Sequence, residues 1–160
     1  LQNGRRFMSL LIKDEATAYA LDIAVAPSFK ARDVEQVLGK TMQQYGKPGF
    51  IRCDNGSQFV AYAVRMWAER NGISMAYIDP GKPWQNGHAE SFVGTYRREV
   101  LDAEVFFTIK DAEILSHRWK RMYNEGDHTA DTTTDHLRLH IRSTDHQVNH
   151  FSKLVAGPIK

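Results

Sequence analysis

The order of strand-like and helix-like segments along the chain predicts an α/β fold. Two short apolar runs near the start are followed by amphipathic stretches that alternate with further strand-sized runs. Of the 160 residues, 42% are hydrophobic, 11% aromatic and 25% charged, so the chain can fill a core and disorder over most of its length is excluded. A chain of this length fits one domain of ordinary size.

Each expected element follows from a local pattern. Short apolar runs bounded by turn residues are typical of strands, and apolar side chains spaced three and four apart are typical of one-faced helices. Thr108 is a favourable N-cap for the last helix, in which Trp119 and Met122 are expected to face inward. The patterns predict strands over residues 6–13, 19–26, 50–53 and 73–78, of which the first two form a hairpin. They predict helices over residues 34–45 and 59–71, from 86 or 87 to about 101, and from 109 onward.

Composition also limits the class of protein. No apolar run is long enough to span a bilayer and residues 1–6 are polar and basic, so we expect a cytoplasmic protein with no membrane partner. The single cysteine, Cys53, excludes an internal disulfide framework and a cysteine-based zinc cluster. A formal charge of +2 is too small to identify a nucleic-acid-binding protein by itself.

Two carboxylates stand at positions where α/β proteins often place functional groups. Asp54 ends the third expected strand, and Glu90 lies in the first turn of the third expected helix, beyond a loop rich in Gly and Pro. A pair of carboxylates held across a cleft suits Mg²⁺ or Mn²⁺, which prefer oxygen ligands. The alternative is that both are ordinary solvated acids, because the chain has 19 Asp and Glu residues from which pairs can be chosen.

Two motifs carry a resemblance to a known family. Residues 82–92 (KPWQNGHAESF) resemble the segment around the last catalytic Glu of DDE transposases and retroviral-type integrases, and residues 52–59 (RCDNGSQF) resemble the segment of that family's second Asp. The thirty-five residues between Asp54 and Glu90 match the spacing in the insertion-sequence branch closest to retroviral integrases. The resemblance covers roughly residues 1–124.

The resemblance implies a ribonuclease H-like fold, a mixed five-stranded sheet flanked by helices. It implies that Asp54 and Glu90 are catalytic and bind metal in a two-metal site for Mg²⁺ or Mn²⁺ that cuts and joins DNA strands by phosphoryl transfer. The implied partners are transposon ends, target DNA and further copies of the chain.

Five residues are candidates for DNA contacts. Arg97 and Gly94 follow Glu90 by seven and four residues, so all three share one helix face, where Gly94 would allow close approach and Arg97 would hold a phosphate. The alternative for the arginines is a solvated surface, and Trp84 in the preceding loop fits packing as well as base stacking. The candidates are Lys82, Gln85, Asn86, Arg97 and Arg98.

The chain departs from the family at its beginning. The first catalytic Asp is missing and is expected a few residues before Leu1, on a central strand whose absence would leave its neighbours with unpaired edges. Asp14 is a possible substitute, but it resembles a non-catalytic acidic position of the family. We therefore predict that the chain alone neither cuts nor joins DNA.

The chain also departs from the family beyond residue 124. A core over residues 1–124 and a divergent tail over 125–160 are the expected units, and residues 124–136 read as a loop or disordered link. His136 and His140 are spaced for a zinc pair on a helix, although scattered surface histidines explain them better.

Three functions remain open at this stage. The first is the catalytic core of a bacterial insertion-sequence transposase, and the second is a non-catalytic remnant that binds DNA or intact transposase subunits. The third is a nuclease acting on RNA–DNA hybrids, which the loop at residues 82–86 disfavours. Whether the chain is itself an enzyme depends on the missing Asp.

Overall fold

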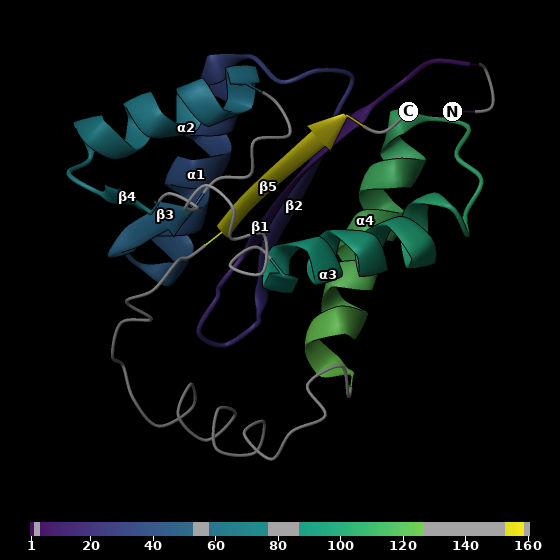
Figure 1. The fold of residues 1–160 in the computed structure, drawn as a ribbon. Helices are drawn as coiled ribbons and strands as arrows, with labels where there is room; N and C mark the ends of the chain where they lie inside the picture. Colours follow the sequence, from purple (N-terminus) through teal and green to yellow (C-terminus); the bar gives the residue numbers. More distant parts are fainter. Residues whose placement is uncertain (2–3, 53–57, 77–86, 127–152, 159–160) are drawn as a thin grey trace.

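The computed structural model describes residues 1, 4–52, 58–76, 87–126 and 153–158 (Figure 1). These segments contain five strands and four α-helices, which bear out most of the expected elements. In chain order they are β1 (Met8–Lys13), β2 (Ala20–Ala26), α1 (Ala31–Tyr45), β3 (Phe50–Arg52), α2 (Gln58–Arg70), β4 (Ser74–Ala76), α3 (Gly87–Tyr96), a π-helical turn (Arg97–Leu101), α4 (Ile109–Glu125) and β5 (Lys153–Pro158).

The hairpin expected from the two apolar runs is confirmed. β1 and β2 pair in antiparallel register, with Met8 opposite Ala26 and Leu10 opposite Ala24. Asp14 turns the chain, because its carboxylate accepts hydrogen bonds from the backbone N–H of Thr17 at 3.3 Å and from the Thr17 hydroxyl at 2.6 Å.

A strand from the far end of the chain pairs with the edge of β1 that faces away from β2, called here the outer edge of β1. β5 runs antiparallel to β1 from the Lys13–Lys153 pair to the Met8–Pro158 pair, and it also contacts β3 (Figure 1). The expectation of an unpaired edge is therefore wrong for β1, because the tail supplies a strand there. The described strands form two hydrogen-bonded sheets, β2-β1-β5 and parallel β3-β4, where the resemblance implies one sheet of five.

Helices cover both faces of β1. Leu10 and Ile12 pack on one face in a cluster with residues of α1 and α2, whereas Leu11 packs on the other face in a cluster with residues of α3 and α4. Alternate residues of a strand point to opposite faces, so a strand covered on both sides carries a continuous apolar run. The segment Met8–Ile12 has this character, apart from the buried Ser9.

Side chains of α4 cover the outer edge of β2. The Asn124 side chain accepts a hydrogen bond from the Ala20 N–H at 2.8 Å and donates one to the Ala20 carbonyl at 2.9 Å. Lys120 Nζ donates to the Leu21 carbonyl at 2.8 Å and lies 3.8 Å from Asp22 Oδ1. The beginning of this edge, at Ala20 and Leu21, is thus paired by side chains, which protects that part of β2 from pairing with another chain.

The start of α4 confirms Thr108 as its N-cap. Thr108 Oγ1 accepts a hydrogen bond from the Asp111 N–H at 3.1 Å, and the Asp111 carboxylate accepts one from the Thr108 N–H at 2.8 Å, which lowers the pKa of Asp111. The expected inward position of Met122 is wrong, since 56% of this residue is exposed. Tyr123 packs inward instead, with its ring centroid 4.9 Å from that of Trp119, one helical turn away.

None of the helices in the described segments combines the length and apolar character needed to cross a bilayer.

Candidate functional site

The rotation of α3 directs Glu90 away from the core. Phe92, Tyr96 and Val100 recur every four residues and are buried against β1, β2 and α4. Glu90 lies in the first turn on the opposite side of the helix and is exposed. The apolar stripe therefore determines which way this carboxylate points.

A chain of hydroxyl groups fixes α3 between the sheet and α4. Tyr96 Oη lies 3.0 Å from Ser9 Oγ on β1 and 2.7 Å from Ser116 Oγ on α4. Ser116 donates its hydrogen to the Ala112 carbonyl at 2.6 Å. Each hydroxyl has one hydrogen, so Tyr96 must donate to Ser116 and accept from Ser9. Burial raises the pKa of Tyr96, so the phenol stays protonated and keeps this direction.

An aromatic cluster packs α3 against α4. The Trp119 ring lies 5.7 Å from that of Phe92 and 5.2 Å from that of Tyr96, measured between centroids. Trp119 Nε1 also donates a hydrogen bond to Glu99 Oε2 at 2.7 Å, at the end where α3 becomes a π-helical turn. The position of Glu90 thus depends on rings from α3 and α4 together.

Arg97 and Arg98 are exposed at the C-terminal end of α3. The Asp102 N–H bonds to the Arg97 carbonyl at 2.9 Å, a five-residue step that widens the helix into a π-helical turn. Arg98 turns back along α3 and donates to Thr95 Oγ1 at 3.1 Å. A Cβ atom built on Gly94 would lie 3.5 Å from Arg98 Nη1, so Arg98 is the cation beside Gly94.

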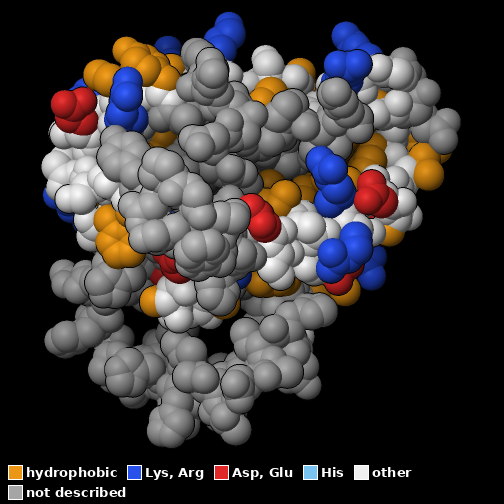
Figure 2. All heavy atoms as spheres, viewed as in Figure 1, with side chains coloured by type: hydrophobic (Ala, Val, Ile, Leu, Met, Phe, Trp, Pro, Cys, Tyr) orange, Lys and Arg blue, Asp and Glu red, His pale blue; other side chains and the backbone are white. Residues whose placement is uncertain are grey.

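Figure 2 shows several Lys and Arg side chains in the region of α3, with acidic side chains beside them. Arg97 and Arg98 are exposed cations that a phosphate backbone could contact, on the same helix as the exposed Glu90.

Asp14 does not fit the role of a third metal ligand. Its carboxylate is fully buried and accepts hydrogen bonds from the N–H groups of Ala16 and Thr17 and from the Thr17 hydroxyl. These donors occupy three of the about four lone-pair sites of the carboxylate, and its complete burial leaves no open side for a hydrated cation and a substrate. The groups that do fit a hard divalent ion are exposed carboxylates such as Glu90. No cluster of three or more metal-binding side chains is found within the described segments.

The remaining expected site residues lie outside the described residues. These are Asp54, Lys82, Gln85 and Asn86, together with Trp84, His136 and His140. The structure thus places Glu90, Arg97 and Arg98 on one helix and gives no position for the second metal-binding carboxylate.

Sequence reasoning missed Lys13, a buried cation beneath α3. Only 7% of Lys13 is exposed, and its Nζ lies 5.3 Å from the centroid of the Phe92 ring. Burial lowers the pKa of Lys13, and the nearby carboxylates of Glu15 and Asp14 offset only part of that effect. The available signal was a charge at the end of an otherwise apolar run.

We expect Lys13→Met to raise the free energy of unfolding at pH 7 by about 1–2 kcal/mol, because a buried charge is replaced by a packed apolar chain. The pKa of Lys13 is lowered in the folded protein, so at high pH the unfolded chain holds a proton that the folded chain has released. Stability of the original chain therefore rises with pH in that range, and the advantage of Lys13→Met narrows as pH approaches 10.5.

Urea unfolding of both proteins from pH 7 to pH 10.5 checks this prediction. Buried tyrosines such as Tyr96 also titrate late, but they are common to both proteins and cancel in the difference. Lys40→Met is the matched control: Lys40 is exposed, so its effect should stay within about 0.5 kcal/mol at every pH. A Lys13→Met protein that is less stable at all pH values would contradict the prediction.

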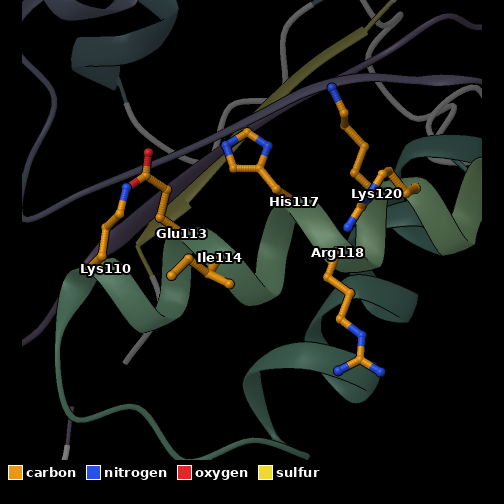
Figure 3. Close-up of a pocket in the computed structure, with 7 residues that line it drawn as sticks. Lys110, Glu113, Ile114, His117, Arg118 and Lys120 are labelled. Carbon is orange, nitrogen blue, oxygen red and sulfur yellow. The ribbon is translucent and has the colours of Figure 1, made fainter.

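A hollow on the outer face of α4 is a second cationic region (Figure 3). Its volume is about 550 Å³ and its lining includes Lys110, Glu113, His117, Arg118 and Lys120. Lys110 and Glu113 point toward each other and form an ion pair at 2.9 Å, while Lys120 reaches β2. Two of these cations are therefore engaged within the protein, and α3 is the better candidate site.

Most of the chain is similar to known proteins of one family. Two family profiles, both described as integrase core domain, match residues 1–83 and 71–126. A Burkholderia multivorans protein named "Insertion element IS407 uncharacterized 31.7 kDa protein" is 36% identical over 125 residues, which make up 78% of this chain and 45% of that protein. A Xanthomonas euvesicatoria protein named "Insertion element IS476 uncharacterized 39.2 kDa protein" is 34% identical over 125 residues, 78% of this chain and 36% of that protein.

The chain thus spans less than half the length of either relative. No solved structure matches it.

Proposed function

The chain belongs to the integrase core domain family, and from this membership we propose that it is the catalytic core of an insertion-element transposase that cuts and joins DNA by metal-dependent phosphoryl transfer. The observation that carries the proposal is the exposure of Glu90. It lies on α3, a helix whose opposite side is packed against the sheet and α4. It lies in the segment that resembles the last catalytic Glu of DDE transposases.

Asp54 and Glu90 would hold the metal ions in this proposal. Mg²⁺ or Mn²⁺, when bound, activates the attacking oxygen and stabilises the leaving oxygen of the phosphodiester. Glu90 contributes a carboxylate on a rigid support, because Phe92 and Tyr96 anchor α3 to the sheet. The third carboxylate would come from outside residues 1–160, so these residues alone would not cut DNA.

The proposed DNA contacts lie on both sides of Glu90. Arg97 and Arg98 would hold phosphates at the far end of α3, where both are exposed. Lys82, Gln85 and Asn86 would line the approach from the preceding loop. Transposon ends and target DNA are the proposed substrates, and joining two DNA ends suits a homo-oligomer.

We expect an Arg97→Ala, Arg98→Ala double variant to bind duplex DNA more weakly and with less dependence on salt. Each lost phosphate contact lowers the slope of log K against log salt by about 0.9, so the double variant should lose up to about 1.8. Fluorescence anisotropy of a labelled duplex at several salt concentrations measures this slope.

The matched control is Arg118→Ala, Arg121→Ala on α4. Both residues are exposed, and Arg118 points away from the Lys110–Glu113 pair (Figure 3). The control should retain the original slope, and an equal loss in the two double variants would contradict a specific role for α3.

One observation favours the second candidate, a non-catalytic protein that binds DNA or transposase subunits. β5 pairs with β1 at the edge where the resemblance implies a missing strand, and the segment Lys153–Pro158 contains no acidic residue. The sheet is extended there without a further carboxylate. Strand transfer by a version of the chain that carries an upstream aspartate would separate the two candidates.

A further inference from the structure

We propose that the outer edge of β1 is a strand-acceptor site, and that its occupant, the tail strand β5, can be replaced in trans by a second molecule of the same segment. The proposal concerns the pairing of strands and does not depend on catalysis.

The edge of β1 is suited to a strand and to little else. Residues Ser9 to Lys13 are all buried, and side chains of α1 and α2 on one face and of α3 and α4 on the other cover the strand. Between these layers, the backbone N–H and C=O groups along the outer edge need partners. An antiparallel strand provides them over six residue pairs, as β5 does.

The sequence of the occupant has the character of a buried strand. Leu154, Val155 and Ala156 are three consecutive apolar residues, a run that is typical of strands covered on both faces. β1, the strand beside it, is covered on both faces and carries a similar run. We therefore expect this edge to accept a short, continuously apolar segment.

The occupant is held by one ladder of hydrogen bonds and by its covalent connection. Among the described strands, β5 forms a hydrogen-bonded ladder only with β1, and β3 and β4 form a separate sheet. The connection runs through residues 127–152, and a tether of this length gives the strand an effective concentration in the millimolar range. A free peptide at micromolar concentration cannot compete with that, so exchange becomes measurable only when the connection is cut.

The experiment uses the full chain with a protease site placed within residues 127–152. After cleavage, a fluorescent peptide of residues 150–160 should be incorporated to a limit of one per chain, and an excess of unlabelled peptide should displace it. The uncut chain should incorporate about 10²–10³-fold less at the same peptide concentration. The control peptide carries both Leu154→Pro and Val155→Pro, because one of these two adjacent residues directs its N–H toward β1 and proline removes that donor.

Cleaved chain that keeps its circular dichroism spectrum but takes up no peptide would overturn the proposal. Equal uptake of the doubly substituted peptide would also overturn it, because binding would then not depend on strand pairing.

The cleaved chain could lose its fold, so a second measurement, hydrogen exchange, is made on the uncut chain. Adjacent residues of a strand direct their N–H groups to opposite edges, so Leu154→Pro and Val155→Pro differ in which edge loses a donor. Hydrogen exchange should show faster exchange of outward-facing amides in Met8–Lys13 in at least one variant, with amides toward β2 retained. Unchanged protection of β1 in both variants would sink the proposal and would leave the proposed DNA chemistry untouched.

Discussion

A version of the chain extended upstream by a strand that carries an aspartate is expected to nick and join DNA in Mg²⁺, and Glu90→Gln should reduce that activity about 10³-fold. An amide keeps the size of the side chain but removes the negative charge that holds a divalent ion. The expected loss corresponds to about 4 kcal/mol of transition-state stabilisation. The rotation of α3 should be unaffected, because Glu90 lies opposite the buried stripe of Phe92 and Tyr96.

Strand-transfer assays on labelled duplex ends measure this effect. Glu104→Gln is the matched control, since Glu104 is an exposed carboxylate in the turn beyond α3 and should leave the rate within about twofold. Residues 1–160 without the extension should show no cleavage. Cleavage by the unextended chain, or full activity of Glu90→Gln, would contradict the assignment of the metal-binding carboxylates.

Trp119→Ala is expected to lower the free energy of unfolding by about 3–5 kcal/mol, the range typical of deleting a large buried side chain. Only 5% of Trp119 is exposed, and its ring contacts those of Phe92, Tyr96 and Tyr123. Its Nε1 also bonds to Glu99, which would lose its donor. Domains of this size are stabilised by about 5–15 kcal/mol in total, so this one change removes a large part of the margin.

Urea unfolding followed by circular dichroism measures the loss. Trp119→Phe is the informative comparison, because it keeps most of the ring packing while removing the hydrogen bond to Glu99, and about 1–2 kcal/mol should be lost. Tyr62→Ala, at a residue that is 54% exposed, should change stability by less than about 0.5 kcal/mol. A Trp119→Ala protein as stable as Tyr62→Ala would show that the aromatic cluster does not support α3.

Most of the fold could be predicted because its signals are local. The hairpin follows from two apolar runs, α1 from the spacing of Val34 and Leu38, and the start of α4 from Thr108 as its N-cap. Each of these patterns lies within about twenty residues, where the periodicity of apolar residues and capping chemistry determine the structure.

What could not be predicted depends on contacts between distant segments. A run such as Leu154 to Ala156 gives no indication that its partner is β1, since short apolar runs suit many positions. The hydrogen bonds between the Asn124 side chain and the backbone of Ala20 in β2 could not be predicted either, because the two residues are far apart in the sequence. The π-helical turn after Tyr96, which brings Arg98 beside Gly94, has no sequence signal that we can name.

The candidate site was only partly accessible to the same reasoning. Glu90 and Arg97 could be grouped from helical spacing, and the structure places Glu90 exposed in the first turn of α3 and Arg97 and Arg98 exposed at the other end of the helix. Asp54 and the three loop residues Lys82, Gln85 and Asn86 lie outside the described residues, so their roles stay predictions. Lys13 was missed because nothing in its immediate neighbours shows that α3 closes over it.

The pairing of β5 with β1 has a consequence for the rate of folding. Met8 pairs with Pro158 and Lys13 with Lys153, so the partners in this ladder lie between 140 and 150 positions apart along the chain. Contacts of such long sequence separation form slowly, because the loop between them must close first. The hairpin of β1 and β2 joins residues that are close in sequence and can form earlier, so during folding β1 carries an open strand edge until β5 docks.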